Sequence, residues 1–194
     1  MSKPSRILPV LAVLLLWLTA CAAKPAADDF AYANTAFTAT VQGTYTPADG
    51  IPRPIAATVT LGAPTEGGIP RSLTVTFQAP DALAGVTVSA TPSIGGDSLP
   101  RRITTFQAPS AYGTVTADDE SGAFDGLLRY AEALLPVGDI VSVTPTAEDG
   151  TRVVTRRTAD GGREGVYTFT EGSVLPTRVE VMTGGVRLEL TVRG

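Results

Sequence analysis

The residues of this sequence that could do chemistry are carboxylates, arginines and one thiol, because the chain of 194 residues contains no histidine. Without histidine, the Ser/His/Asp and Cys/His arrangements of nucleophilic catalysis, the usual zinc sites and the commonest general base are excluded. Catalysis would have to rest on carboxylate, lysine, tyrosine or arginine side chains. We therefore expect a protein that is not an enzyme and that holds no metal and no cofactor.

Three acidic clusters could serve as sites, but each has a simpler structural explanation. The run Asp118-Asp119-Glu120 could bind a hard cation through its oxygens. It lacks the spacing of a calcium loop, however, and it precedes a predicted helix, where acidic side chains cap exposed N–H groups. Glu148-Asp149-Gly150 and Asp160-Gly161-Gly162 have the composition of hairpin turns. We favour a cap for the first cluster and turns for the other two.

The one cysteine, Cys21, follows a segment that has the order of a signal peptide. Lys3 and Arg6 are basic, residues 7–18 are apolar apart from a proline, and the small residues 19–20 come just before the cysteine. The apolar run is shorter than the roughly 20 residues that a permanent transmembrane helix needs. These features predict export of the chain and removal of its first segment.

The four residues Leu18-Thr19-Ala20-Cys21 resemble the bacterial lipobox. The resemblance implies a diacylglycerol on the Cys21 sulfur, cleavage before Cys21 and a further acyl chain, such as palmitate, on the new N-terminus. Two or more acyl chains give stable membrane anchoring. We expect a signal peptide over residues 1–20 and a lipidated N-terminus and tether over residues 21–34. The tether includes the pair Asp28-Asp29 as a solvated linker and turns helical at its end, and a single domain follows over residues 35–194.

The charge balance argues against nucleic acid as a partner. Loss of Lys3 and Arg6 leaves 13 basic residues against 19 acidic ones, a formal net charge of −6, and no lysine follows Lys24. Nucleic-acid-binding domains instead carry a basic patch or stripe. With Cys21 acylated, no thiol remains for disulfides, although an exported protein could use them.

Most of the chain after residue 35 shows the two-residue period of half-buried strands. Apolar and polar residues alternate in segments that begin at Phe37, Ala57, Leu73, Val86, Val179 and Val186. Short breaks rich in Pro, Gly and Asp separate these segments, and they favour an antiparallel meander of about ten strands. Residues 122–135 interrupt this pattern with apolar positions at helical spacing, so they predict one helix that Pro136 ends.

Two segments carry a resemblance to a known superfamily. They are FQAPDALAGVTV (residues 77–88), where a strand ends at proline and resumes at glycine, and GVYTFTEGSVLPTRVEV (residues 165–181), where two strands flank a Leu-Pro turn. Together with the predicted helix and the final strand, they resemble the LolA/LolB/LppX-like superfamily, and most nearly its uncharacterised Gram-positive lipoproteins. The resemblance implies a mainly β fold with one or two helices, in which a strongly curved antiparallel sheet forms an incomplete β-barrel closed by helix.

The resemblance also implies a cavity that holds acyl chains between the sheet and the helix. The candidate lining residues are Phe37, Tyr45, Val75, Phe77, Phe124, Leu127, Leu128, Leu134, Val181 and Leu188. One short helix cannot cover so many strands unless the sheet curls, and the curled sheet either fills its interior with side chains or leaves a cavity. Small inward residues such as Ala39 and Gly43 favour the cavity slightly.

Two functions remain open. The first is a membrane-anchored extracytoplasmic lipoprotein that binds or transfers a lipid or an acylated molecule. The alternative is a lipid-anchored interaction or scaffold module of the cell envelope with a filled core and an exposed apolar patch. In both cases we expect a monomer, attached to the extracytoplasmic face of the cell membrane through Cys21. In a Gram-negative cell, Ala22 after the cysteine would indicate the outer membrane.

Overall fold

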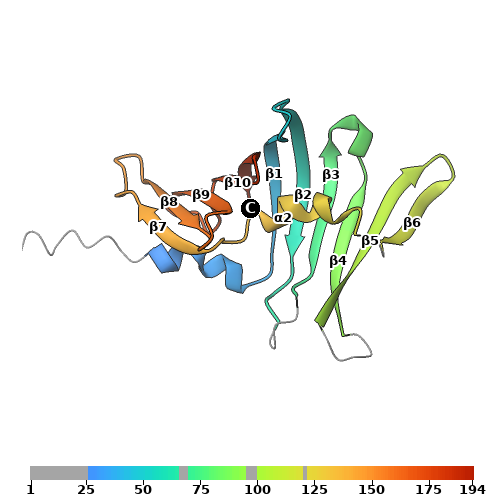
Figure 1. Ribbon diagram of the computed structural model, residues 1–194, viewed down its shortest axis with the longest axis horizontal. Helices are drawn as coiled ribbons and strands as arrows, with labels where there is room; N and C mark the ends of the chain where they lie inside the picture. The colour runs from blue at the N-terminus through green and yellow to red at the C-terminus, as the bar shows by residue number, and fades with distance from the viewer. Residues whose placement is uncertain (1–25, 66–69, 95–99, 120–121) are drawn as a thin grey trace, which may run out of the picture.

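The computed structural model of the chain describes residues 26–65, 70–94, 100–119 and 122–194 (Figure 1). The predicted signal peptide and Cys21 lie outside the described residues. The strands are β1 (Phe37–Thr46), β2 (Arg53–Leu61), β3 (Leu73–Ala79), β4 (Thr87–Ile94), β5 (Pro100–Ser110), β6 (Gly113–Asp119), β7 (Asp139–Val143), β8 (Thr151–Arg157), β9 (Arg163–Thr170), β10 (Arg178–Thr183) and β11 (Val186–Arg193). The helical segments are the 3₁₀ helices η1 (Ala26–Asn34), η2 (Asp81–Leu83) and η3 (Asp125–Leu128) and the short α-helix α2 (Arg129–Glu132).

All eleven strands belong to one antiparallel sheet with the order β6-β5-β4-β3-β2-β1-β11-β10-β9-β8-β7. The sheet therefore consists of two meanders, β1 to β6 and β7 to β11, that meet where the first strand pairs with the last. In that pairing Val41 lies opposite Val192 and Tyr45 lies opposite Leu188. The segment containing η3 and α2 connects the two meanders across the sheet, from β6 at one edge to β7 at the other (Figure 1).

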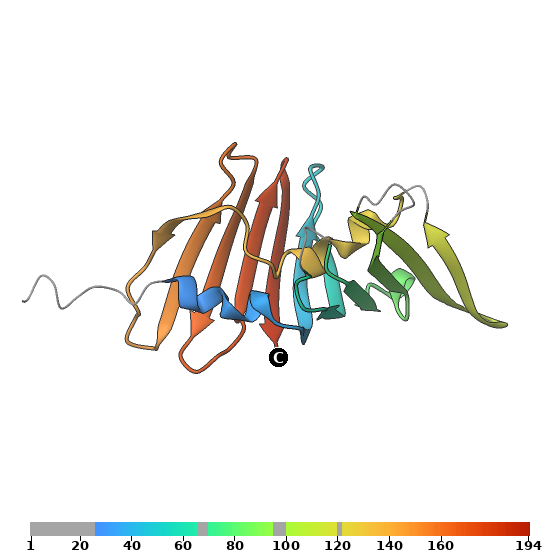
Figure 2. The same cartoon turned by 90° about the horizontal axis from the view of Figure 1, so that it is seen from below.

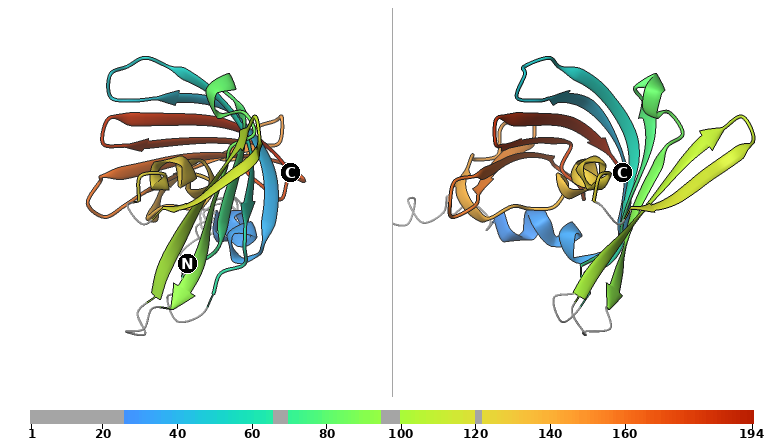
Figure 3. Two further views of the ribbon diagram at one scale, coloured as in Figure 1. Left: turned by 90° about the vertical axis from the view of Figure 1, so that its right-hand side faces the viewer. Right: turned by 45° about the vertical axis from the view of Figure 1, so that its right-hand side comes forward.

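The sheet is strongly curved, and its helices lie on the concave side (Figures 2 and 3). In Figure 2, η1 crosses the strands of the second meander, whereas α2 crosses those of the first. Consistent with this view, α2 packs on β2 and β3, and η3 packs on β3 and β4. The predicted fold class is thus confirmed: the protein is mainly β, with an open, curved antiparallel sheet that carries helix on its concave face. The described residues form eleven strands rather than about ten.

The period-two pattern of the sequence produces the two faces of the sheet. In β2 the side chains of Ala57, Val59 and Leu61 are buried on the concave side, whereas the intervening Thr58 and Thr60 are half-buried or exposed. The same alternation runs through β3, β9 and β11. A curved sheet of this kind buries one face and leaves the other in water, as antiparallel sheets commonly do.

The predicted helix over residues 122–135 forms in a shorter and less regular way. Helical structure begins at Asp125 and ends at Glu132, and its first turn is a 3₁₀ helix. Glycine is costly inside a helix because it loses the most backbone freedom on folding, and Gly122 and Gly126 occupy the expected first turns. Beyond Glu132, the Ala133 amide still donates to the fourth preceding carbonyl, whereas the amides of Leu134 and Leu135 donate to the third preceding carbonyl and tighten the chain.

The segment expected to be a tether forms η1, which lies against the sheet. Its predicted helical end is confirmed, but the expectation of a solvated linker is wrong for Asp29. Phe30 packs edge-on against Tyr167 and Phe169, at ring-centroid distances of 5.1 and 5.4 Å. Asp29 forms an ion pair with Arg152 of β8, and their side chains are only 9% and 17% exposed. Alternating Ala and aromatic residues thus supply an apolar face that docks on the second meander.

Gly43 of β1 permits a close approach of neighbouring strands and does not open a cavity. A Cβ atom at position 43 would lie 1.8 Å from the carbonyl oxygen of Glu189 on β11. Any side chain there would push apart the strands that join the two meanders. The small residues Ala39, Ala57 and Ala90 are likewise fully covered in the core.

Candidate functional site

A pocket of about 320 Å³ lies where the segment containing η3 and α2 meets one rim of the sheet. Four groups of residues line it: Tyr45, Arg53, Pro54 and Ile55 from β1 and β2; Pro80 and Leu83 from the turn between β3 and β4; Ala123, Gly126 and Leu127; and Arg129 and Tyr130 of α2. Its volume falls at the lower end of the range for small-molecule sites, about 300–1,000 Å³.

The sheet register places the first group of lining residues. Tyr45, near the end of β1, lies directly opposite Arg53, which begins β2, so the two side chains flank the same end of the sheet. The β3–β4 turn lies at the same rim because β3 runs parallel to β1 in the alternating meander. The peptide bond before Pro80 is cis, and Leu83 lies in the short helix η2 that follows.

The floor and walls of the pocket are apolar. Ile55 and Tyr130 are buried, and the half-buried side chains of Leu83 and Leu127 pack against the same core. The Tyr130 ring meets Phe77 edge-on at 5.5 Å and Tyr45 at 6.4 Å. Burial raises the pKa of Tyr130 above its usual value; at neutral pH its phenol is neutral, as in any unperturbed tyrosine, and can donate a hydrogen bond.

The polar groups of the pocket are donors. The Arg129 guanidinium donates a 2.8 Å hydrogen bond to the hydroxyl of Tyr45 and lies 5.0 Å from the centre of that ring, a cation–π distance. It also donates to the carbonyl of Gly126 at the start of the turn. Arg53 is 59% exposed at the rim and reaches Asp49 at 3.4 Å. No aspartate or glutamate is among the lining residues, so the pocket wall carries positive charge.

Arg129 has no carboxylate partner among the described residues. Within residues 26–65, 70–94, 100–119 and 122–194, its guanidinium contacts only a hydroxyl, a carbonyl and an aromatic ring. By contrast, Arg102 pairs with Glu132 at 2.9 Å and Arg187 pairs with Glu180 at 2.8 Å. Like Arg71 and Arg156, which donate to backbone carbonyls, Arg129 offsets the cost of desolvating its charge through hydrogen bonds to neutral groups.

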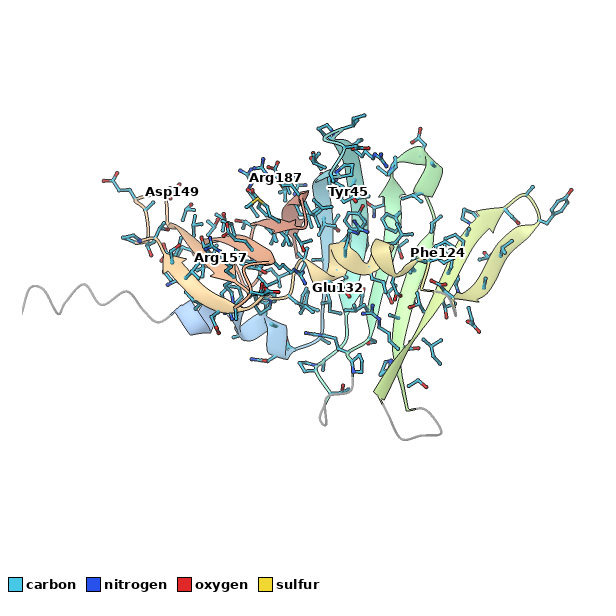
Figure 4. All side chains as sticks on the ribbon, in the orientation of Figure 1. Tyr45, Phe124, Glu132, Asp149, Arg157 and Arg187 are labelled. Atoms are coloured by element: carbon cyan, nitrogen blue, oxygen red, sulfur yellow. The ribbon has the colours of Figure 1, made fainter. Side chains whose placement is uncertain are left out.

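The residues predicted to line a cavity are divided between the pocket and the core. Tyr45 and Leu127 line the pocket (Tyr45 is labelled in Figure 4). Six others are buried in the core that fills most of the concave side: Val75, Phe77, Leu128, Leu134, Val181 and Leu188. The remaining two are half-buried at its margin. Phe37 meets Tyr32 edge-on at 5.4 Å, and Phe124 stacks on Phe106 at 4.3 Å (Phe124 is labelled in Figure 4).

Sequence reasoning missed both cations of the pocket. The signal for Arg129 was present, because it is a lone charge inside the apolar run GLLRYAEALL of residues 126–135. Arg53 gave no signal, since an arginine beside turn residues is common at a solvated rim. Pro54 and Pro80 are typical of the breaks between strands, and in the structure they also form part of the pocket wall.

Within the described residues, which do not include Glu120, the acidic clusters have the structural roles expected for them. The Asp119 carboxylate accepts hydrogen bonds from the backbone amides of Ala123 and Phe124, the latter at 2.6 Å, just before η3. Asp149 accepts from the amide of Thr151 at 2.9 Å in the β7–β8 turn, and this hydrogen bond holds the pKa of Asp149 below its usual value. Among the described residues, no group of three His, Cys, Asp or Glu side chains could hold a metal ion.

The three arginines of β8 are engaged by partners within the chain. Arg152 pairs with Asp29, and Arg157 donates to Glu164 at 2.7 Å (Arg157 is labelled in Figure 4). Arg156 donates to the carbonyl of Val137 at 2.8 Å and lies over the ring of Phe30. Arg152 and Arg156 hold η1 and the chain after α2 against the second meander. No helix in the part of the chain that the structure describes is long and apolar enough to cross a membrane.

Comparison with solved structures finds distant likenesses. A LolA superfamily protein from Nitrosomonas europaea is similar with a TM-score of 0.43 and 12% sequence identity, over 87% of this chain and 88% of that chain. An outer membrane lipoprotein-sorting protein domain from Vibrio parahaemolyticus is similar with a TM-score of 0.40 and 13% identity, over 82% and 84% of the two chains. No protein-family model and no curated protein matches the sequence. At such scores these likenesses carry no argument about function, and the description of the fold rests on the sheet itself.

Proposed function

We propose that this protein is a membrane-anchored extracytoplasmic lipoprotein that binds or transfers a lipid or an acylated molecule in the pocket beside α2. The observation that carries the proposal is the pocket of about 320 Å³, which combines apolar walls with a few donors. Small-molecule sites typically have this composition, with apolar side chains for affinity and a few polar groups that orient the ligand. The function is binding, and no catalytic step is part of the proposal.

An acyl chain suits this pocket because its walls are aliphatic and aromatic carbon. Leu83, Leu127 and Ile55 face the space together with two prolines and the ring of Tyr130. Burial of each methylene group of a ligand against such a surface contributes about 0.8 kcal/mol. The rest of the concave face is filled by core side chains, so the ligand would occupy one end of the space between sheet and helix.

The anchor belongs to the proposal through the sequence around Cys21, which lies outside the described residues. Acylation there would hold a monomeric domain at the extracytoplasmic face of the cell membrane, or at the outer membrane of a Gram-negative cell. The test is growth of expressing bacteria with alkyne-tagged palmitate. The chain should incorporate the tag, and the Cys21→Ala variant should not. Equal labelling of both chains, or of neither, would contradict the anchor.

The binding function is tested by lipid extraction. The full chain carrying Cys21→Ala is expressed in bacteria, purified without detergent, denatured and extracted for mass spectrometry of lipids. We expect a near-stoichiometric acyl compound that is lost in Leu127→Glu, which places a charge in the pocket wall. The matched control is Val174→Glu, at an exposed position of the β9–β10 turn. An extract without acyl compound, together with failure to take up a fluorescent fatty acid, would contradict lipid binding.

A second candidate function, an interaction module of the envelope, is favoured by the hairpin of β5 and β6. The strand β6 is exposed on both faces for most of its length, and the hairpin exposes Ile103, Val115 and the whole side chain of Tyr112 at its tip. Such side chains are typical of partner-binding surfaces. If lipid extraction and fatty-acid uptake both fail, cross-linking from position 112 to envelope proteins tests this alternative.

A further inference from the structure

We propose that the pocket selects single-chain amphiphiles with an anionic head group, and that Arg129 and Arg53 are the residues that determine this specificity. The inference rests on the proposed function, because it names the class of ligand that the same pocket would bind. It depends on three features of the described residues: the charge of the lining, the unpaired state of Arg129 and the size of the pocket.

The lining is rich in donors and contains no acidic side chain. Two guanidinium groups and two phenols, those of Tyr45 and Tyr130, are its side-chain polar groups. Because the Tyr45 oxygen accepts the hydrogen bond from Arg129, its own proton remains free to point into the pocket. A neutral alcohol or ester would leave most of these donors unsatisfied. A carboxylate or a phosphate monoester offers several acceptor sites and matches the planar fork of an arginine.

The position of Arg129 indicates that its counter-ion comes from outside the chain. Its aliphatic stem starts from α2, which packs on β2 and β3, so the guanidinium is half-buried next to the Tyr45 ring. The nearby acidic residue Asp125 is engaged with Thr104 at 2.7 Å, and Glu132 is engaged with Arg102 at 2.9 Å. Neither carboxylate is among the lining residues. An anionic ligand would therefore neutralise a charge that the described protein leaves unpaired.

Arg53 supports the same preference from the rim of the pocket. Its ion pair with Asp49 is a single contact of 3.4 Å between two side chains that are more than half exposed. Surface pairs of this kind contribute little, so Arg53 can turn toward a ligand at small cost. One guanidinium held inside the pocket and one at its mouth would meet a head group from two sides.

The volume of the pocket suits a ligand with a single acyl chain. A water molecule takes about 30 Å³ of the liquid, and a methylene group is of similar size. The pocket volume of 320 Å³ thus holds on the order of ten heavy atoms, enough for a head group and part of one acyl chain. Diacyl lipids would have to leave a whole chain outside.

The experiment is calorimetric titration of the full chain carrying Cys21→Ala with four probes that separate head group from chain. They are decanoate, decyl phosphate, decanol and acetate. We expect decanoate or decyl phosphate to bind about tenfold or more tightly than decanol, as charge-assisted hydrogen bonds imply. Which anion binds more tightly identifies the source of the head group, a fatty acid or a phosphorylated lipid. Acetate should not bind measurably, because it lacks the chain.

The variants Arg129→Gln and Arg53→Gln test the two residues, and Arg178→Gln, exposed on β10, is the matched control. The preference for the anions over decanol should fall to within about threefold in Arg129→Gln and shrink in Arg53→Gln, and it should persist in the control. Arg53→Gln keeps the test valid if Arg129→Gln fails to fold. Equal affinity for decanol and the anions, or a preference that survives both pocket variants, would overturn this inference alone. Failure of every ten-carbon probe to bind would overturn the proposed function with it.

Discussion

Truncation of Leu128 should destabilise the fold far more than truncation of its neighbour Leu127. Leu128 is 0% exposed and lies in the core between η3 and the sheet, whereas Leu127 lines the pocket. Leu→Ala removes three carbons, and at about 0.8 kcal/mol for each buried carbon the transfer cost is about 2.4 kcal/mol. A residual cavity of about 30 Å³ adds about 0.7 kcal/mol at 24 cal/mol/Å³. The expected loss for Leu128→Ala is therefore about 3 kcal/mol.

The assay is urea unfolding followed by circular dichroism, with Leu127→Ala as the matched control. With a slope of about 2 kcal/mol/M, the Leu128 variant should shift the midpoint down by about 1.5 M. Leu127→Ala removes carbons that are already partly in water and leaves no closed cavity, so its loss should be about 1 kcal/mol. Equal losses for the two variants, or a loss below about 1 kcal/mol for Leu128→Ala, would refute the separation of a filled core from an open pocket.

Three further predictions follow from contacts outside the pocket. Asp29→Asn removes the partner of the largely buried Arg152 and should cost about 2 kcal/mol in urea unfolding, because a poorly solvated charge loses its counter-ion. Burial raises the pKa of Tyr167 to about 12, so the folded state keeps a proton that the unfolded state releases above about pH 10. The contribution of Tyr167 to stability should be full below pH 10 and fall by about 2 kcal/mol by pH 12, in addition to the fall from Tyr32 and Tyr130, whose pKa values burial also raises. Tyr167→Phe should remove the Tyr167 contribution and make the total fall shallower. Gly138→Ala should cost about 3 kcal/mol, because its φ is +42° and a Cβ would lie 2.0 Å from the carbonyl oxygen of Arg157.

Each of these predictions has a control in the same chain. Asp49→Asn at the exposed rim should change stability by less than about 0.5 kcal/mol, and a similar loss at Asp29 would contradict the buried ion pair. Tyr112→Phe, at a fully exposed tyrosine, should leave the alkaline fall unchanged. Gly161→Ala has φ of +70° but no atom within 4 Å, so it should cost only about 1 kcal/mol. Equal costs at Gly138 and Gly161 would show that the close backbone contact has no effect.

The strands were predicted well because the alternation of apolar and polar residues along a strand depends only on residues that are neighbours in the sequence. The segments beginning at Phe37, Leu73 and Val186 all form strands with the expected face buried. The fold class followed from the short turns between them, which favour antiparallel neighbours. The exact pairing of β1 with β11 depends on residues about 150 positions apart in a register that no local pattern encodes.

The docking of η1 and the position of the pocket were harder to predict because both depend on tertiary contacts. From the sequence, we expected Asp29 to be part of a solvated linker. Its ion-pair partner Arg152 lies on a strand far along the chain, so no pattern of neighbouring residues identifies it. The apolar face of the segment around Leu128 was correctly identified, but the sequence could not separate residues that fill the core from those that border a pocket. That division depends on how far the short helix reaches across the curved sheet.

The most direct test of ligand binding in this pocket is methyl-resolved NMR of the full chain carrying Cys21→Ala during titration with decanoate. We predict saturable shifts for the methyl groups of Leu83, Leu127 and Ile55, which line the pocket, and little change for Leu188, which is buried in the core on β11. If decanoate shifts no methyl group, or shifts those of Val115 on the exposed hairpin and leaves the pocket unchanged, the account of this protein as an acyl-binding lipoprotein is contradicted.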